Sequence, residues 1–205
     1  LINQKEDLKR FKEKIGFFSQ EKVKGKLIWF HGASVGELKS VIPLIERFEK
    51  DKKINQILIT SNTLSSSKII KEIKFKKVIH QFFPIDNNFI VKKFINHWKP
   101  SKVFFIDSEI WPNTILNLKK SKISLILINA RITKKTFQRW IFFKKFAKKI
   151  FSSFDICLSS NKETKRYLKI LKANNIKYFG NLKFIEPKEK KIDVDLKLKM
   201  LFKNK

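Results

Sequence analysis

The sequence predicts an α/β domain built on a Rossmann-like parallel sheet, and two observations support this prediction. Short apolar runs rich in β-branched and aromatic residues alternate with longer segments of helical periodicity. Each apolar run is nearly continuous, as in strands that helices cover on both faces. Repeated βα units of this length imply a parallel sheet with right-handed crossovers.

The expected elements follow in order along the chain. Apolar residues at helical spacing predict an amphipathic lead-in helix within residues 1–24: Leu8, Phe11, Ile15 and Phe18. The domain proper is expected over residues 25–184, with strands at 27–31, 56–60, 77–83, 102–107, 123–128 and 155–159. Its helices are expected at 36–50, 65–74, 87–98, 112–120, 134–151 and 161–173. Charged sequence with Pro187 predicts a linker over residues 185–205.

Composition limits the classes of protein that fit. The 205 residues are enough for one α/β domain with a sizeable core, and 42% are hydrophobic, which excludes a disordered polyelectrolyte. Lys and Arg number 47 against 18 Asp and Glu, a net charge of +29. This excess suits nucleic acid, anionic lipid or a phosphorylated substrate, or else it reflects biased residue usage spread over solvated faces.

Cysteine and histidine usage argues against a metal site. The single cysteine, Cys157, excludes an internal disulfide and favours a reducing compartment, and the three histidines show no metal-ligand spacing. No apolar run approaches the roughly 20 residues of a membrane-spanning helix. Because the chain begins at Leu1 rather than at a methionine, we expect it to be part of a longer protein.

The turn after the first strand reads HGASVGE, residues 31–37. Gly32 and Gly36 let the backbone bend sharply and approach a ligand, and Ser34 lies between them. The N–H groups at the start of the next helix favour an anion, but the spacing fits neither a dinucleotide nor a P-loop motif. Glu37 is either a functional carboxylate or a residue that interacts favourably with the helix dipole.

The turn after the fourth strand carries two acids, Asp107 and Glu109, behind the apolar run KVFFI. Carboxylates in a cleft act as bases or orient a cationic group. Alternatively, Asp107 or Ser108 caps the helix that Pro112 begins.

Two basic residues follow later strands. Arg131, after the fifth strand, suits bidentate binding of a carboxylate or phosphate, and a surface salt bridge is an equal alternative. Lys183 follows a tight turn at Gly180, where it meets an anionic group or is simply one of many solvated lysines.

Residues 140–154 divide cleanly at helical periodicity. Lys144, Lys145, Lys148 and Lys149 occupy one face. The other face carries Trp140, Phe143, Phe146, Ala147, Ile150, Phe151 and Phe154. This pattern fits a domain helix with its apolar stripe in the core, or an interfacial helix with aromatics inserted into a membrane and lysines on anionic headgroups.

An ordered set of segments resembles the 3-deoxy-D-manno-octulosonic acid (Kdo) transferases of Gram-negative lipopolysaccharide synthesis. They are LIWFHGASVGE (27–37), IPLIERF (42–48), ITSNTLSSS (59–67), HQFFPID (80–86), FINHWKPSKVFFIDSEIWPN (94–113), INARIT (128–133), FDICLSSNKET (154–164) and GNLKF (180–184). The likeness covers most of residues 1–184, and the HGASVGE, acidic-x-acidic-WPN and NAR motifs are its most specific parts.

The resemblance implies the N-terminal half of a GT-B glycosyltransferase. In this family the N-terminal domain receives the lipid A precursor (lipid IVA) and the C-terminal domain binds CMP-Kdo. The reaction inverts the anomeric centre and needs no metal or other cofactor. A membrane anchor usually precedes this region, so the enzyme is expected at the cytoplasmic face of the inner membrane. The present chain would lack the anchor and the donor domain, and alone it would not transfer sugar.

The resemblance also implies residue roles. Glu37 matches the general base, which removes a proton from the acceptor hydroxyl as that oxygen attacks C2 of Kdo. Asp107 matches the first acid of the acidic motif, one methylene shorter than usual, and Glu109 the second; either one carries the stabilisation of the transition state. Lys183 matches a further stabilising position. Substrate contacts are expected from Gly32, Ser34, Gly36 and Arg131.

Two rival functions fit parts of the sequence. Another GT-B glycosyltransferase that uses a nucleotide sugar would share the fold, and its C-terminal half would discriminate. A nucleic-acid-binding domain would explain the +29 charge. Since no RRM, KH, zinc-finger or helix-turn-helix signature is present, nucleic acid is not an expected partner.

Overall fold

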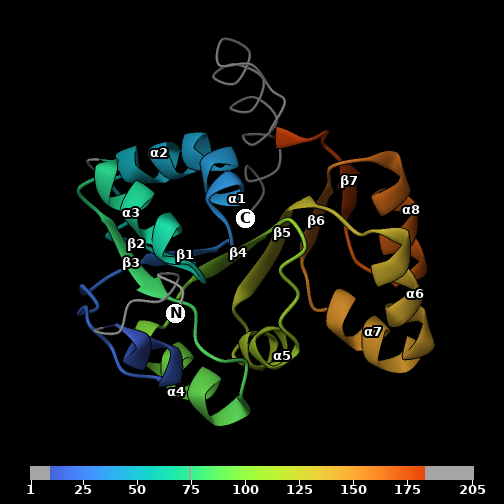
Figure 1. Ribbon diagram of the computed structural model, residues 1–205, viewed down its shortest axis with the longest axis horizontal. Helices are drawn as coiled ribbons and strands as arrows, with labels where there is room; N and C mark the ends of the chain where they lie inside the picture. The colour runs from blue at the N-terminus through green and yellow to red at the C-terminus, as the bar shows by residue number, and fades with distance from the viewer. Residues whose placement is uncertain (1–9, 74, 183–205) are drawn as a thin grey trace, which may run out of the picture.

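The computed structural model of the protein describes residues 10–73 and 75–182. Its centre is a seven-stranded sheet of order β3-β2-β1-β4-β5-β6-β7, in which every neighbouring pair is parallel (Figure 1). The strands are β1 (Leu27–His31), β2 (Gln56–Ser61), β3 (Val78–Phe82), β4 (Lys102–Ile106), β5 (Ser124–Ala130), β6 (Ile156–Ser159) and β7 (Ile176–Tyr178). The expected Rossmann-like parallel sheet is confirmed.

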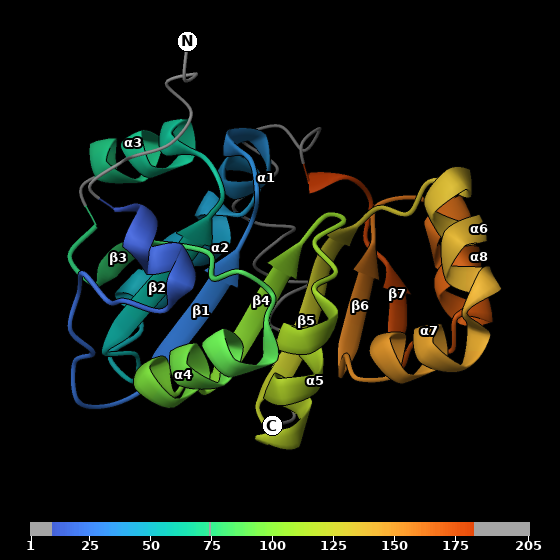
Figure 2. The same ribbon diagram turned by 60° about the horizontal axis from the view of Figure 1, so that its bottom comes forward.

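Helices cover both faces of the sheet (Figure 2). They are α1 (Val35–Ser40), α2 (Ile42–Lys50), α3 (Leu64–Glu72), α4 (Asn88–Trp98), α5 (Pro112–Lys120), α6 (Lys134–Phe142), α7 (Lys144–Phe151) and α8 (Lys162–Ile170). Within the described residues, none of these helices has the length and apolar character needed to cross a membrane.

Successive side chains of each strand point to opposite faces of the sheet, so the core has two layers. Ile28 and Phe30 of β1 pack with residues of α1, α2 and α3, whereas Leu27 and Trp29 pack with α4, α5, α7 and α8. Period-two alternation sends successive side chains to opposite faces of a sheet. Because both faces are covered, the strands are apolar throughout, and each fully buried large side chain contributes about 1.5–3 kcal/mol.

Two of the expected helices are each divided in two. The helix expected at 36–50 breaks at Val41, because Pro43 in the first turn of α2 has no N–H and its ring clashes with a continuing helix. The helix expected at 134–151 breaks at Phe143 (φ −108°, ψ 53°). There the two halves have different neighbours: α6 stacks Phe137 on Tyr167 of α8, and α7 contacts α5.

Strand β7 was not expected from the sequence. It has three residues, it lies at the sheet edge beside β6, and two of its side chains are exposed. Such a segment lacks the continuous apolar run that marks the inner strands.

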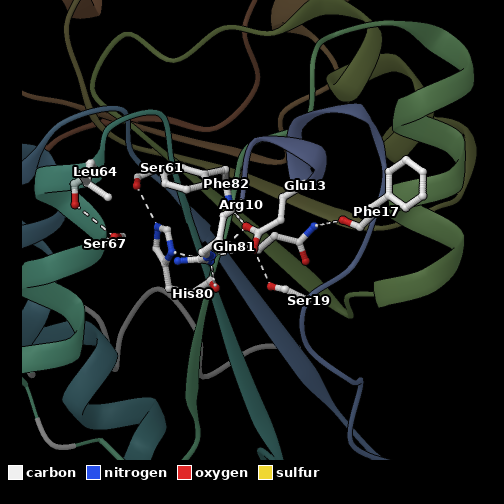
Figure 3. Close-up of polar contacts among 10 residues, drawn as sticks. All are labelled: Arg10, Glu13, Phe17, Ser19, Ser61, Leu64, Ser67, His80, Gln81 and Phe82. Carbon is white, nitrogen blue, oxygen red and sulfur yellow. Dashed lines mark hydrogen bonds and ion pairs between the residues drawn. The ribbon is translucent and has the colours of Figure 1, made fainter. Parts of the chain in front are cut away.

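The prediction of an amphipathic lead-in helix is wrong for the part of residues 1–24 that the structure describes. Only a 3₁₀ helix, Phe11–Ile15, forms, and Gly16 ends it with φ +87°. Figure 3 shows the reason: the segment is held by polar contacts to the edge of β3 rather than by helical periodicity. The Glu13 carboxylate accepts from the Phe82 main-chain N–H at 2.7 Å, and Arg10 donates to the His80 carbonyl at 2.8 Å.

These side chains occupy backbone groups that an exposed edge strand would otherwise offer to another chain. Leu8 and the linker expected over residues 185–205 lie outside the described residues.

Candidate active site

The sheet reverses its strand order between β1 and β4. From β1 the chain proceeds outward to β2 and β3, and from β4 it proceeds the other way to β5, β6 and β7. In open α/β sheets, ligands bind outside the carboxyl ends of the strands at such a switch point. The turns that begin at Gly32 and Asp107 leave β1 and β4 at this place, so the fold brings together the HGASVGE segment and the acidic motif.

Glu37 is held within its own turn by a capping box. Its main-chain N–H donates to the Ser34 hydroxyl at 3.3 Å, and that hydroxyl donates to Glu37 Oε1 at 2.8 Å. The Ala33 N–H donates to Glu37 Oε2 at 2.8 Å. This pattern satisfies donors at a helix start. Glu37 therefore does interact favourably with the start of its helix, as one of the two alternatives from the sequence predicted.

Three amides of this segment already have partners within the protein. The Ala33 and Glu37 amides are both used inside the turn, and the Gly32 N–H donates to the Thr60 carbonyl at 3.2 Å. Of these three donors, only the Ala33 amide holds an anion, and that anion is the Glu37 carboxylate.

The environment of Glu37 makes it a stronger base than an ordinary glutamate. Burial raises its pKa, the hydrogen bonds from Ser34 and Ala33 lower it, and the charges of Glu109 and Asp107 raise it further. The net direction is upward. A carboxyl with a raised pKa accepts a proton more readily while its oxygens stay ordered by two donors.

The two glycines of this turn lie in different surroundings. A Cβ on Gly32 would lie 3.1 Å from Leu38 Cδ2, 3.2 Å from Ile106 Cδ1 and 3.3 Å from Glu37 Cβ. Gly32 therefore permits the close approach of the turn to β4 and to α1. Gly36 is exposed, and a Cβ there would have no heavy atom within 4 Å.

Glu109 is fixed by two donors that come from different segments. His31 Nε2 lies 3.2 Å from Glu109 Oε2, and Trp111 Nε1 donates to the same oxygen at 2.8 Å. Burial by itself raises the pKa of Glu109, but the hydrogen bond and charge of His31 and the hydrogen bond of Trp111 outweigh it. The pKa of Glu109 is therefore lowered, and the group is a carboxylate at neutral pH.

Asp107 lies directly behind β4 in a left-handed conformation, with φ +61° and 7% exposure. Its amide donates to the Ile128 carbonyl at 2.9 Å, and its carbonyl accepts from the Arg131 amide at 3.3 Å. Asn129, near the end of β5, has φ +53°, and its side chain accepts from the Leu182 amide at 3.1 Å. Such backbone conformations are enriched for Asp and Asn and cluster at functional sites.

Neither Asp107 nor Ser108 caps α5. The N-cap position is Trp111, which provides no side-chain hydrogen bond. Asp86 takes this role from the β3–α4 connection, with its carboxylate accepting from the Asn113 and Thr114 amides at 2.9 and 2.8 Å. The two acids behind β4 are therefore not needed for helix capping.

The basic candidates differ in what the structure shows. Arg131 is exposed, and its guanidinium makes no hydrogen bond or ion pair within residues 10–73 and 75–182, so the surface salt bridge is not seen there. Lys183 lies outside the described residues, one position beyond Leu182. In the part of the chain that is described, no group of three or more His, Cys, Asp or Glu side chains is placed to hold a metal ion.

His31 is the site residue that sequence reasoning missed. The three histidines lack metal-ligand spacing, and His31 ends an apolar strand, so the sequence pattern alone gives it no role. A polar residue ending such a strand beside a turn that carries acids was the signal available. Its contact with Glu109, 78 residues away, exists only because β1 and β4 are neighbours.

Comparison with known proteins identifies the family. The sequence matches a family model described as 3-deoxy-D-manno-octulosonic-acid transferase (kdotransferase) over residues 9–186. A 3-deoxy-D-manno-octulosonic acid transferase of Rickettsia bellii is 36% identical over 189 residues, 92% of this chain and 45% of the relative. One of Chlamydia pneumoniae is 29% identical over 162 residues, 78% of this chain and 37% of the relative. The chain thus spans less than half the length of these curated relatives.

Solved structures share the fold at low identity. UDP-GlcNAc 2-epimerase from Neisseria meningitidis, solved bound to UDP-GlcNAc, superposes with a TM-score of 0.56 at 11% identity over 87% of this chain and 54% of that chain. UDP-N-acetylglucosamine 2-epimerase from Rickettsia bellii gives 0.54 at 18% identity over 85% and 49%. The chain corresponds to about one half of each of these proteins. The fold, the ordered motifs and the match over residues 9–186 together show that this chain belongs to the 3-deoxy-D-manno-octulosonic-acid transferase family.

Proposed function

We propose that the protein containing this chain transfers Kdo from CMP-Kdo to a lipid A precursor, lipid IVA, in lipopolysaccharide biosynthesis. This chain is its acceptor-side half, and CMP-Kdo binds mainly through a second, C-terminal domain. The observation that carries the proposal is the Glu37 carboxylate. Two donors order it at a strand end, and its pKa is raised. The resemblance to the family motif matches this residue to the general base.

The proposed reaction is a single displacement that inverts the anomeric centre. Glu37 takes the proton of an acceptor hydroxyl while that oxygen forms a bond to C2 of Kdo. The bond between C2 and the CMP phosphate oxygen breaks at the same time, and CMP leaves with its electron pair. Proton removal and departure of a phosphate need no Lewis acid if cationic side chains offset the negative charge, so we propose a metal-independent step without a cofactor.

The remaining site residues are proposed to stabilise charge and hold the substrate. Positive charge develops at C2 as the leaving group departs, and the carboxylates of Asp107 and Glu109 favour it. Of the two, Glu109 is supported by its lowered pKa and its fixed geometry. Lys183 and Arg131 are proposed to bind the anionic groups of the substrates, and the Gly32–Gly36 turn, with Ser34, contacts the acceptor sugar.

A membrane-facing surface is proposed around α7, at the cytoplasmic face of the bacterial inner membrane. Phe142 and Phe143 are 82% and 61% exposed at the break between α6 and α7. Beside them is a hollow of about 340 Å³, lined by Ile141, Lys144, Lys145, Lys148, Ile170, Leu171 and Lys172. No acidic residue occurs between Glu109 and Asp155 in the sequence. Exposed aromatics beside uncompensated lysines suit an anionic lipid surface, where the acceptor lies.

The function is tested with the protein encoded by the complete reading frame that contains this chain. The assay supplies CMP-Kdo and lipid IVA, follows CMP release, and determines the configuration of the new glycosidic bond by NMR. We expect transfer with inversion, at the same rate with and without EDTA. A folded, complete protein that is inert toward this pair would refute the proposed substrates, and activity abolished by EDTA would refute metal independence.

A further inference from the structure

His31 is completely buried and contacts polar groups at both ring nitrogens. Nδ1 lies 3.2 Å from the Thr60 carbonyl oxygen and 3.0 Å from Thr60 Oγ1. Nε2 lies 3.2 Å from Glu109 Oε2. The ring is stacked on Phe83 with centroids 3.8 Å apart, so it is held in one orientation. Of the two nitrogens, Nε2 is the one whose partner, a carboxylate oxygen, can only accept.

Nδ1 has two possible partners on Thr60, since it can donate to the carbonyl oxygen or accept from the hydroxyl. Thr60 Oγ1, the second group near Nδ1, is itself an acceptor for Trp29 Nε1 at 2.8 Å. If Nε2 were unprotonated, its lone pair would face a carboxylate oxygen at 3.2 Å, which is repulsive. A proton on Nε2 turns this contact into a charge-assisted hydrogen bond.

The consequence is an ordered Glu109. Both donors, His31 Nε2 and Trp111 Nε1, meet Oε2 of this carboxylate. Its other oxygen, Oε1, has no hydrogen-bond partner among the residues that the structure describes. One oxygen is therefore anchored in the protein, and the other remains for a ligand at the switch point between β1 and β4.

We propose that His31 is a positioning residue: its Nε2–H anchors Glu109 through Oε2 and leaves Oε1 to act on the reacting sugar. This inference rests on the proposed function and adds a residue to it. The titratable groups on the elements that face the pair are the carboxylates of Glu37 on α1 and Asp107 behind β4, both of which are negative when ionised. The other rings around His31 are Phe83, Phe105 and Trp111, none of which titrates.

Two substitutions of His31 test the anchor. In His31→Gln the terminal amide nitrogen takes the place of Nε2, so it still donates to Glu109 but carries no charge. In His31→Asn the amide takes the place of Nδ1, so it keeps the Thr60 contact and loses the Glu109 anchor. Both remain polar and uncharged, and thermal denaturation serves as the folding control.

In the complete enzyme we expect kcat to fall about 10²-fold in His31→Asn, the cost of a misplacement of about 1 Å at a reacting centre. His31→Gln should recover most of this loss, with KM for both substrates nearly unchanged in the two variants. Equal kcat in the two variants would overturn the positioning role.

A second measurement does not depend on sugar transfer or on a folded His31 variant. ¹⁵N NMR of the 205-residue chain reports which ring nitrogens of His31 carry protons. We expect a proton on Nε2 in the wild type, because this nitrogen faces the Glu109 carboxylate. An unprotonated Nε2 would reject the hydrogen bond to Glu109, whereas an inert enzyme with the expected spectrum would reject only the proposed function.

Discussion

The hydroxyl of Ser34 donates to the Glu37 carboxylate at 2.8 Å and accepts from the Glu37 amide at 3.3 Å. Ser34, the N-cap residue of α1, is therefore also one of the two groups that order the proposed base. Helix capping and catalysis are not alternatives for Glu37, because the capping geometry is what holds its oxygens at the strand end.

Replacement of this hydroxyl should affect both stability and the pH dependence of the reaction. Ser34→Ala should lower the free energy of unfolding by about 0.5–2 kcal/mol, the usual cost of losing an N-cap side chain. The Ser34 hydrogen bond lowers the pKa of Glu37, so its loss should raise that pKa further. Because a base must be ionised, the acidic limb of kcat/KM should then move to higher pH.

Chemical denaturation and a pH–rate profile of the complete enzyme measure these two effects. Ser65→Ala, at an exposed position in α3, is the control and should change neither. An unmoved acidic limb in Ser34→Ala, with stability lowered, would leave Ser34 a capping residue only.

The two glycines of the HGASVGE segment should respond oppositely to alanine. Gly32→Ala places a Cβ 3.1–3.3 Å from three neighbouring atoms, one of them the Glu37 Cβ, and should cost about 1–3 kcal/mol of stability and displace the base. Gly36→Ala has open space in a helix and should be neutral or stabilising by about 0.5–1 kcal/mol. Equal melting temperatures for the two variants would argue against the close packing of the turn on β4.

The lysines of α7 should matter for membrane binding. Replacing Lys144, Lys145, Lys148 and Lys149 with serine removes cations that each contribute about 1 kcal/mol near an anionic surface. Affinity for phosphatidylglycerol vesicles in a sedimentation assay should therefore fall at least about tenfold. The matched control replaces Lys50, Lys52, Lys53 and Lys76, which are exposed near β2 and β3 at the opposite end of the sheet.

If both quadruple variants lose binding equally, net charge rather than the α7 surface attracts the protein. A companion variant, Phe142→Ser with Phe143→Ser, keeps all the lysines. It should retain the attraction to vesicles at low salt but lose the binding that resists high salt, because only aromatic insertion is independent of screening.

The inner strands could be predicted from sequence because each is a continuous apolar run buried on both faces, as Leu27–His31 and Lys102–Ile106 are. Elements that depend on tertiary contacts could not. Residues 10–24 have helical spacing of apolar residues, yet Glu13 is buried against Phe82 at the β3 edge and the helix stops at Gly16. A three-residue edge strand such as Ile176–Tyr178 offers too little pattern to detect.

Part of the candidate site could be predicted, because it depends on strands that the sequence itself reveals. Asp107 and Glu109 lie in the turn after β4, and Glu37 lies in the first turn of the helix after β1. The rule for parallel sheets places all three at one edge. The partners of Glu109 were not predictable, because they depend on β1 lying beside β4 and on the rotamers of His31 and Trp111. The capping role of Asp86 likewise depends on a contact between two connections far apart in the chain.

The central claim, that Glu37 is the general base, is tested most directly by Glu37→Gln in the complete enzyme. The amide keeps the size of the side chain but cannot take the proton of the acceptor hydroxyl. Glu46→Gln, an exposed glutamate of α2, is the matched control. With saturating CMP-Kdo and lipid IVA, we predict a kcat about 10²–10⁴-fold below that of the wild type in Glu37→Gln, with an unchanged fold, and wild-type turnover in Glu46→Gln. A Glu37→Gln enzyme that transfers Kdo at a rate close to that of the wild type would contradict the account.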